Sequence, residues 1–117
     1  TLAARDAGIR FLEGNMHPNM IGHDVDTVVR NELKKHGLDK YFIHGTGHHM
    51  DEWHVHGPGY NFKQKDQRLL IPGTGCTIEP GVYIPEKFGI RSECDILLKK
   101  DTIEVTTPLQ TEWIMLE

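Results

Sequence analysis

Residues 23–36 carry the clearest pattern of apolar and polar positions in the chain. The apolar side chains recur at three- and four-residue intervals, which places them on one face of an amphipathic helix; they are Val25, Val28, Val29 and Leu33. Asp24 and Asp26 lie in the first turn and three basic residues lie in the last, as the helix dipole favours. Gly37 follows as a stop, so the pattern predicts a helix over residues 23–36.

A second, looser apolar face precedes this segment. Leu2, Ile9 and Leu12 share one side of residues 1–13, and Gly14 with Asn15 supplies the end of a helix. The stretch 16–21 contains Pro18 and is predicted to be a loop. The first third of the chain is therefore expected to form a pair of helices.

From residue 41 onward the pattern changes to strands and turns. A polar loop runs from Gly57 to Gly73, and two β-rich runs follow it, Cys76–Ile84 and Gly89–Leu98, joined by a connection with a proline. In the second run the alternation of residues places Arg91, Glu93, Asp95 and Leu97 on the face opposite Ile90, Ser92, Cys94 and Ile96. The charged face is either a polar outer edge or the lining of a site. We predict a single α+β unit over residues 1–117, two helices followed by an antiparallel sheet.

Composition narrows the functional classes. Hydrophobic residues make up 38% and charged residues 26%, as in an ordinary globular domain. No apolar run is long enough for a transmembrane helix, and the N-terminus lacks the pattern of a signal peptide. The net charge of −4 and the lack of a Lys/Arg run argue against nucleic-acid binding. Cys76 and Cys94 form no CxxC motif, so we expect reduced, buried thiols and a cytoplasmic location.

Three local motifs carry candidate chemistry. Five of the eight histidines lie between positions 44 and 56, and His48 closes the Gly-rich turn HGTGH. Glu79 precedes a Pro-Gly kink in TIEPG, and Glu93 follows Arg91 in the middle of a β-rich run. Carboxylates together with an imidazole on rigid strands suit a hydrolytic metal site. We therefore predict His48, Glu79 and Glu93 to be metal ligands.

In the order HGTGH, GTGCTIEPGVYIP and FGIRSECDILL, the chain resembles the pita-bread metallopeptidases, which include methionine aminopeptidase, Xaa-Pro aminopeptidase and Xaa-Pro dipeptidase. The resemblance covers nearly the whole chain. The Arg-x-Glu form of the third motif, with PGVYIP, is more similar to the proline-directed branch. The resemblance implies the C-terminal half of a pita-bread catalytic domain and a peptide substrate that contains proline.

The same resemblance implies a site with two divalent ions, with manganese expected and cobalt or zinc also suitable. His48 and Glu79 would bind one ion, and Glu93 would bridge both. A hydroxide shared by the ions would attack the scissile carbonyl, because two cations lower the pKa of a shared water. Glu79 could also carry the proton.

Three further residues have implied roles in substrate binding. His56 is expected to hold the substrate carbonyl, and His54 is the alternative, because the segment after His48 departs from the family pattern. His44 is expected to line the pocket on the proline side. Arg91 is expected to orient the acids and the substrate.

The chain departs from the family in a second way. The family has two further ligands, both Asp, on a hairpin upstream of the His motif. Asp6, Asp24, Asp26 and Asp39 lie in or beside predicted helices and lack that setting. We therefore expect the N-terminal half to be supplied from upstream or by a companion chain, and the isolated chain to be weakly active or inactive. An uncovered sheet edge also favours pairing, such as a homodimer.

Two alternatives differ in class. A non-catalytic binding module of the same fold is the first, although such proteins usually lose several ligands together. The second is a cupin-type barrel, for which His54-Val55-His56 offers the H-x-H pair. The sequence after that pair is Gly57-Pro58-Gly59-Tyr60, without the Glu that a cupin needs, and two N-terminal helices fit a cupin poorly.

Overall fold

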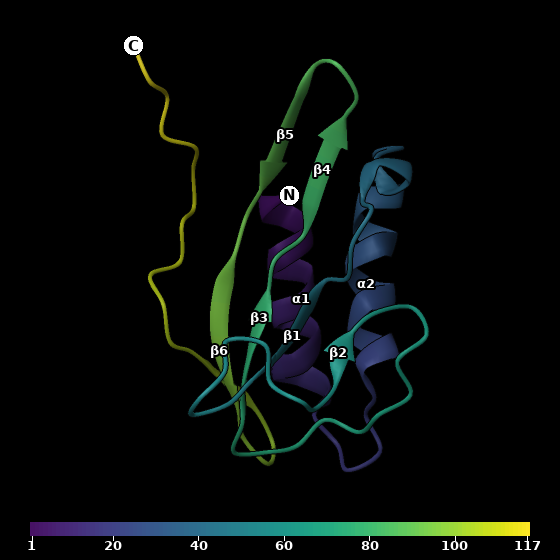
Figure 1. Cartoon of the computed structure of the whole chain (residues 1–117), viewed down its shortest axis with the longest axis vertical. Coiled ribbons are helices and arrows are strands. Elements are labelled where there is room, and N and C mark those ends of the chain that lie inside the picture. The colour runs from purple at the N-terminus through teal and green to yellow at the C-terminus, as the bar shows by residue number, and fades with distance from the viewer.

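The computed structural model describes all 117 residues and begins with two helices (Figure 1). Helix α1 spans Leu2–Asn15 and α2 spans Gly22–Lys34, and a short 3-10 helix, η1, spans Asp39–Tyr41. Both predicted helices are confirmed with shifted ends. Gly37 adopts a φ of +67° and its N–H bonds to the Lys34 carbonyl at 3.0 Å, so it ends α2 as predicted, although the helix itself stops at Lys34. No helix is long and apolar enough to cross a membrane.

Seven short strands follow the helices, and every pairing between them is antiparallel. The strands are β1 (Gly47–Met50), β2 (Asn61–Phe62), β3 (Gly75–Ile78), β4 (Gly81–Ile84), β5 (Phe88–Arg91), β6 (Cys94–Leu98) and β7 (Ile103–Val105). Five of them form a sheet in the order β2-β1-β3-β6-β7, and β4 and β5 pair only with each other. The predicted α+β class, with an antiparallel sheet after two helices, is confirmed.

The two predicted β-rich runs are each broken, which the sequence analysis did not anticipate. The first run divides into β3 and β4 at Glu79-Pro80, and the second into β5 and β6 at Ser92-Glu93. The breaks face each other, because the Ser92 N–H donates to the Pro80 carbonyl at 3.2 Å. Proline has no N–H to offer a sheet ladder, which explains the break at Pro80. The β4–β5 hairpin therefore leaves the main sheet at paired bends (Figure 1).

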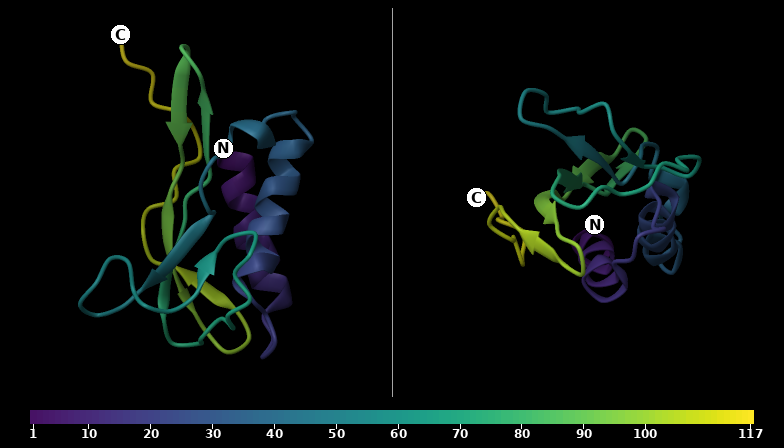
Figure 2. Two further views of the ribbon diagram at one scale, coloured as in Figure 1. Left: turned by 45° about the vertical axis from the view of Figure 1, so that its right-hand side comes forward. Right: turned by 90° about the horizontal axis from the view of Figure 1, so that it is seen from below.

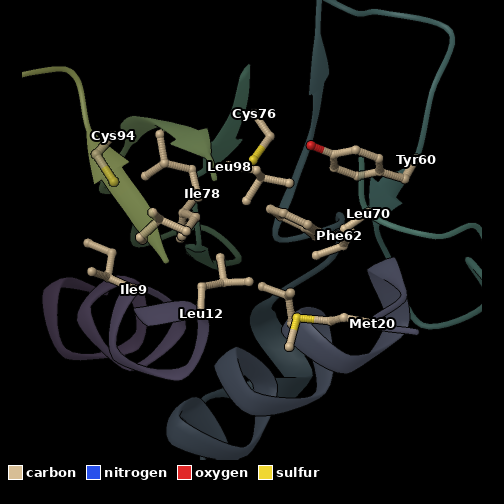
Figure 3. Packing of buried hydrophobic residues seen from close by; sticks show 13 residues of the cluster. Ile9, Leu12, Met20, Tyr60, Phe62, Leu70, Cys76, Ile78, Cys94 and Leu98 are labelled. Atoms are coloured by element: carbon tan, nitrogen blue, oxygen red, sulfur yellow. The ribbon is translucent and has the colours of Figure 1, made fainter. Parts of the chain in front are cut away.

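Both helices lie on one side of the sheet (Figure 2). Ile9 and Leu12 of α1 point toward Ile78 and Leu98, and these side chains belong to the main core cluster (Figure 3). In α2 the buried stripe contains Val25, Val29 and Leu33, whereas Val28 is only half-buried and lies at the edge of the predicted apolar face. Intervals of four residues keep the first three within about 80° of one another around the helix axis, whereas Val28 lies about 60° to the other side of Val25.

The core leaves no room for a side chain where β1 passes β3. A Cβ on Gly47 would lie 1.9 Å from the Thr77 carbonyl oxygen, so only glycine allows this approach. Cys76 and Cys94 are both buried and unbonded. Residues 106–117 extend from the body without a helix or strand (Figure 1).

Candidate functional site

A cleft of about 340 Å³ lies where the HGTGH turn meets the bends at the base of the β4–β5 hairpin. None of its lining residues is hydrophobic; they are His44, Gly45, Gly47, His48, His56, Asn61, Lys63, Glu79 and Arg91. Five of the seven residues predicted for the site therefore meet in one place. Glu93 joins them through an ion pair with Arg91, and His54 lies elsewhere.

His48 and Glu79 face each other across the cleft. The His48 Nε2 lies 3.2 Å from Glu79 Oε1. The other ring nitrogen, Nδ1, lies 3.1 Å from the His49 carbonyl oxygen, which can only accept, so Nδ1 carries the proton. The lone pair of Nε2 then points at a carboxylate oxygen. Two such acceptors at this distance require a proton or a cation between them.

Thr77 fixes both members of this pair, and the sequence analysis missed it. Its hydroxyl donates to Glu79 Oε1 at 2.8 Å and accepts from the His48 N–H at 3.1 Å. The side chain is buried. Thr77 lies two residues before Glu79 on a strand, and this period of two was the signal that could have placed them on the same side.

Arg91 bridges the two acids. Its Nη1 lies 3.4 Å from Glu79 Oε2 and its Nη2 lies 3.2 Å from Glu93 Oε2. Burial and then the neighbouring Glu79 carboxylate raise the pKa of Glu93, and Arg91 opposes them. The two acids therefore lie within electrostatic range of each other, although 14 positions separate them in the chain.

The donor set suits a divalent cation by its chemistry. One imidazole nitrogen and two carboxylates are ligands that manganese, cobalt and zinc accept, and His48 with Glu79 already converges. The arrangement is not closed, because no three His, Cys, Asp or Glu side chains form a group that could hold a metal ion as they stand. The Glu93 carboxylate is engaged by Arg91 instead.

The structure separates the two histidines that the sequence left as alternatives. His56 lines the cleft, and its ring stacks on that of His48 with centroids 4.0 Å apart. The His54 side chain is 66% exposed and bonds to Asp51 at 3.1 Å on the surface loop. Position therefore favours His56 for contact with a substrate.

His44 is held by a residue of the hairpin. Its Nδ1 donates to the Gly45 carbonyl at 2.8 Å, so its Nε2 accepts from the Tyr83 hydroxyl, also at 2.8 Å. Tyr83 lies over Gly81, where a Cβ would come within 2.4 Å of the hydroxyl oxygen. Tyr83 was not predicted, because only the register of β4 against β5 reveals its direction.

A buried acid on α2 anchors the HGTGH turn. Asp26 is fully buried, and its carboxylate accepts from Thr46, Arg30 and Gln64. Arg30 continues to the Phe42 carbonyl at 2.8 Å and also donates to the His44 carbonyl. Asp26 was predicted only as an acid that suits the helix dipole, and its buried role in holding the turn was not anticipated. Arg30, one turn after Asp26, was the available signal.

Thr46 extends this anchor to the second motif. Its carbonyl accepts the Glu79 N–H at 2.6 Å. The helix, the turn that precedes His48 and the bend that carries Glu79 are thus joined by consecutive hydrogen bonds. Because Asp26, Thr46 and Glu79 are themselves buried, these groups cannot exchange their partners for water.

Comparison with known proteins gives consistent matches. The sequence model of metallopeptidase family M24 matches residues 1–100. The Xaa-Pro dipeptidase of Pyrococcus furiosus is 32% identical over 95 residues, which are 81% of this chain and 27% of that protein.

Solved structures agree with the sequence matches. A dipeptidase from Pyrococcus horikoshii gives a TM-score of 0.85 at 30% identity and covers 98% of this chain and 31% of that one. The X-Pro aminopeptidase of Thermotoga maritima gives a TM-score of 0.77 at 30% identity, over 93% and 30% of the two chains. The agreement confirms the predicted pita-bread fold. The chain spans less than a third of the length of each of these proteins.

Proposed function

The chain belongs to metallopeptidase family M24, and we propose that it carries part of the active site of an exopeptidase that hydrolyses peptide bonds next to proline. The observation that carries this proposal is the pair of His48 Nε2 and Glu79 Oε1, 3.2 Å apart in a polar cleft. Relatives named Xaa-Pro dipeptidase and X-Pro aminopeptidase support the choice of substrate class.

In this proposal His48, Glu79 and Glu93 would hold the divalent cations. Such cations act as Lewis acids on a peptide carbonyl and lower the pKa of a water. Thr77 keeps one oxygen of Glu79 directed at His48. Manganese is the ion we expect, and cobalt and zinc fit the same donors.

The protein side chains supply the proton transfers and the orientation. Glu79 accepts the proton of the attacking water and passes it to the leaving amine. His56, stacked on His48 at the cleft, donates a hydrogen bond to the carbonyl oxygen of the scissile bond. His44, fixed by Tyr83, lies on the side that receives the proline residue.

The site needs a further part to act. This chain offers three of the five ligands that the family resemblance implies, and Asp6, Asp24, Asp26 and Asp39 all lie in helices. No hydrophobic side chain lines the cleft, so a hydrophobic side chain to contact a proline ring has to come from elsewhere. We propose that an upstream half or companion chain supplies both, and that the isolated chain is weakly active or inactive.

A non-catalytic binding module is the second candidate. The observation in its favour is that the three proposed ligands do not form a closed metal-binding group. The two functions differ in whether a metal-loaded protein cleaves a peptide. Binding of an Xaa-Pro peptide without cleavage by a longer, manganese-loaded product of the gene would favour the module.

Manganese titration of the purified chain by calorimetry tests the ligand assignment. We expect binding that His48→Ala abolishes and that His36→Ala, at an exposed histidine after α2, leaves unchanged. Equal binding by the two variants would refute the assignment. In a longer gene product, hydrolysis of an Xaa-Pro peptide is expected to disappear on Glu93→Ala.

A further inference from the structure

Arg91 occupies the position between the two acids at the bends. Its two guanidinium nitrogens reach different carboxylates, Glu79 at 3.4 Å and Glu93 at 3.2 Å. Both distances exceed the roughly 2.7–2.9 Å of a strong charge-assisted hydrogen bond. The Arg91 side chain is also 49% exposed. Arg91 is therefore held by long, partly solvated ion pairs that it can exchange for water at small cost.

Thr77, the other donor to Glu79, is buried, unlike Arg91. Oε1 of this carboxylate accepts from Thr77 at 2.8 Å and faces His48, whereas Oε2 faces Arg91. One oxygen is fixed by a buried neighbour and the other by a half-exposed cation. The arrangement lets Oε2 change its partner without moving Oε1.

Charge explains why a cation belongs at this point. Glu79 and Glu93 carry two negative charges, and paired carboxylates of like charge repel each other. Arg91 supplies one positive charge to both of them. A divalent cation would supply two positive charges to the same two carboxylates, so it would compete with Arg91 for them.

We propose that Arg91 is an internal placeholder for the metal, which bridges Glu79 and Glu93 and releases them when a divalent cation binds. This inference rests on the proposed function, since it assigns the same two acids as ligands. It makes Arg91 a positioning residue whose release sets the affinity for the ion. It also accounts for the open arrangement of the three ligands, because Glu93 is turned toward Arg91.

The test compares manganese binding of the chain and of Arg91→Gln by isothermal titration calorimetry. Removing the competing cation is expected to tighten binding by about three- to tenfold, the scale of one or two half-exposed ion pairs. Lys87→Gln removes the same charge from the hairpin turn, away from the cleft, and is expected to leave the affinity unchanged. Arg91→Lys keeps the charge, and its manganese affinity is expected to lie between those of the parent chain and Arg91→Gln.

A second readout needs no metal. Without Arg91 the two acids repel each other, so Arg91→Gln is expected to melt at a lower temperature than the parent chain in the presence of a chelator. Added manganese is expected to raise its melting temperature by more than that of the parent chain. The two readouts together decide the proposal even if one variant is less stable.

The outcomes separate this inference from the proposed function. If the chain binds manganese through His48 but Arg91→Gln binds equally or more weakly, the placeholder is refuted and the ligand assignment stands. If neither protein binds manganese, both are refuted. If the single variant Arg91→Gln binds manganese more tightly than the parent chain, and the double variant Arg91→Gln/His48→Ala loses this binding, both the placeholder and the ligand assignment are supported.

Discussion

Asp26 Oδ1 accepts two hydrogen bonds from Thr46, one from its backbone N–H at 2.9 Å and one from its hydroxyl at 2.8 Å. The two residues are 20 positions apart, and both are fully buried. The contact ties α2 to the turn that leads into His48. The buried Asp26 carboxylate in α2 therefore helps to position the turn that carries His48 into the cleft.

Asp26→Asn is expected to lower the free energy of unfolding by about 2–4 kcal/mol, because an amide cannot accept all four hydrogen bonds and leaves buried donors unpaired. Urea denaturation followed by circular dichroism measures the change. Asp101→Asn removes the same charge from an exposed turn and should change stability by less than about 0.5 kcal/mol. Equal effects of the two substitutions would show that the buried network does not stabilise the fold.

Thr77→Val is expected to weaken manganese binding several-fold, because the variant keeps the shape but removes the donor to Glu79. Thr77→Ser keeps the hydroxyl and should bind as the parent chain does. Loss of the buried hydrogen bond should also cost about 1–2 kcal/mol of stability. Calorimetric titration of the two variants gives the comparison, and indistinguishable affinities would contradict the role assigned to the hydroxyl.

Tyr83→Phe is expected to change the tautomer of His44. In the parent chain Nδ1 carries the proton and Nε2 accepts from Tyr83, so the phenol holds one tautomer. Without that donor the imidazole is expected to populate both tautomers. Long-range ¹H–¹⁵N correlation spectra resolve the two nitrogens. Tyr41→Phe, on η1, serves as the control, and an unchanged His44 spectrum in Tyr83→Phe would rule out the contact.

The ionised Asp66 carboxylate is expected to stabilise the folded chain at neutral pH and to lose this effect in acid. Its hydrogen bonds to the Arg68 side chain, and then to the Arg68 and Asn61 N–H groups, lower the pKa of Asp66 from 3.8 to about 2. A pKa depressed in the folded state contributes stability that is fully present above the unfolded value, so the contribution is lost as the pH falls from about 4 through about 2.

Thermal unfolding of the parent chain and Asp66→Asn between pH 7 and pH 2 tests this dependence. The parent chain should be the more stable at pH 7, and the difference between the two should shrink below about pH 4. Asp101→Asn, at an exposed turn, supplies the matched control. A difference that stays constant down to pH 2 would contradict the role of the ionised carboxylate.

The helices and the members of the cleft follow largely from local pattern. The spacing of Val25, Val29 and Leu33 is enough to place α2, and Gly37 marks its stop. The motifs around His48 and Glu79 predict that these residues belong to a site, and folding brings both into one cleft. Local pattern succeeds there because each signal lies within a few consecutive residues.

The interactions between motifs could not be predicted in the same way. Asp26 looks like any first-turn acid until Thr46 is known to lie beside it, and Tyr83 looks like an ordinary strand residue until it reaches His44. The break in the second β-rich run depends on the bend at Pro80 across from Ser92. Each of these contacts joins residues that are distant in sequence and adjacent only in the folded chain.

The paired bends place both acids at the base of the β4–β5 hairpin. Glu79-Pro80 and Ser92-Glu93 form this base, and β4 and β5 pair with no other strand. Both acids therefore stand at the base of one hairpin, and Tyr83 on the same hairpin contacts His44. The position of this single hairpin is thus shared by residues on both sides of the cleft, and Val82 fixes it by packing against the helices.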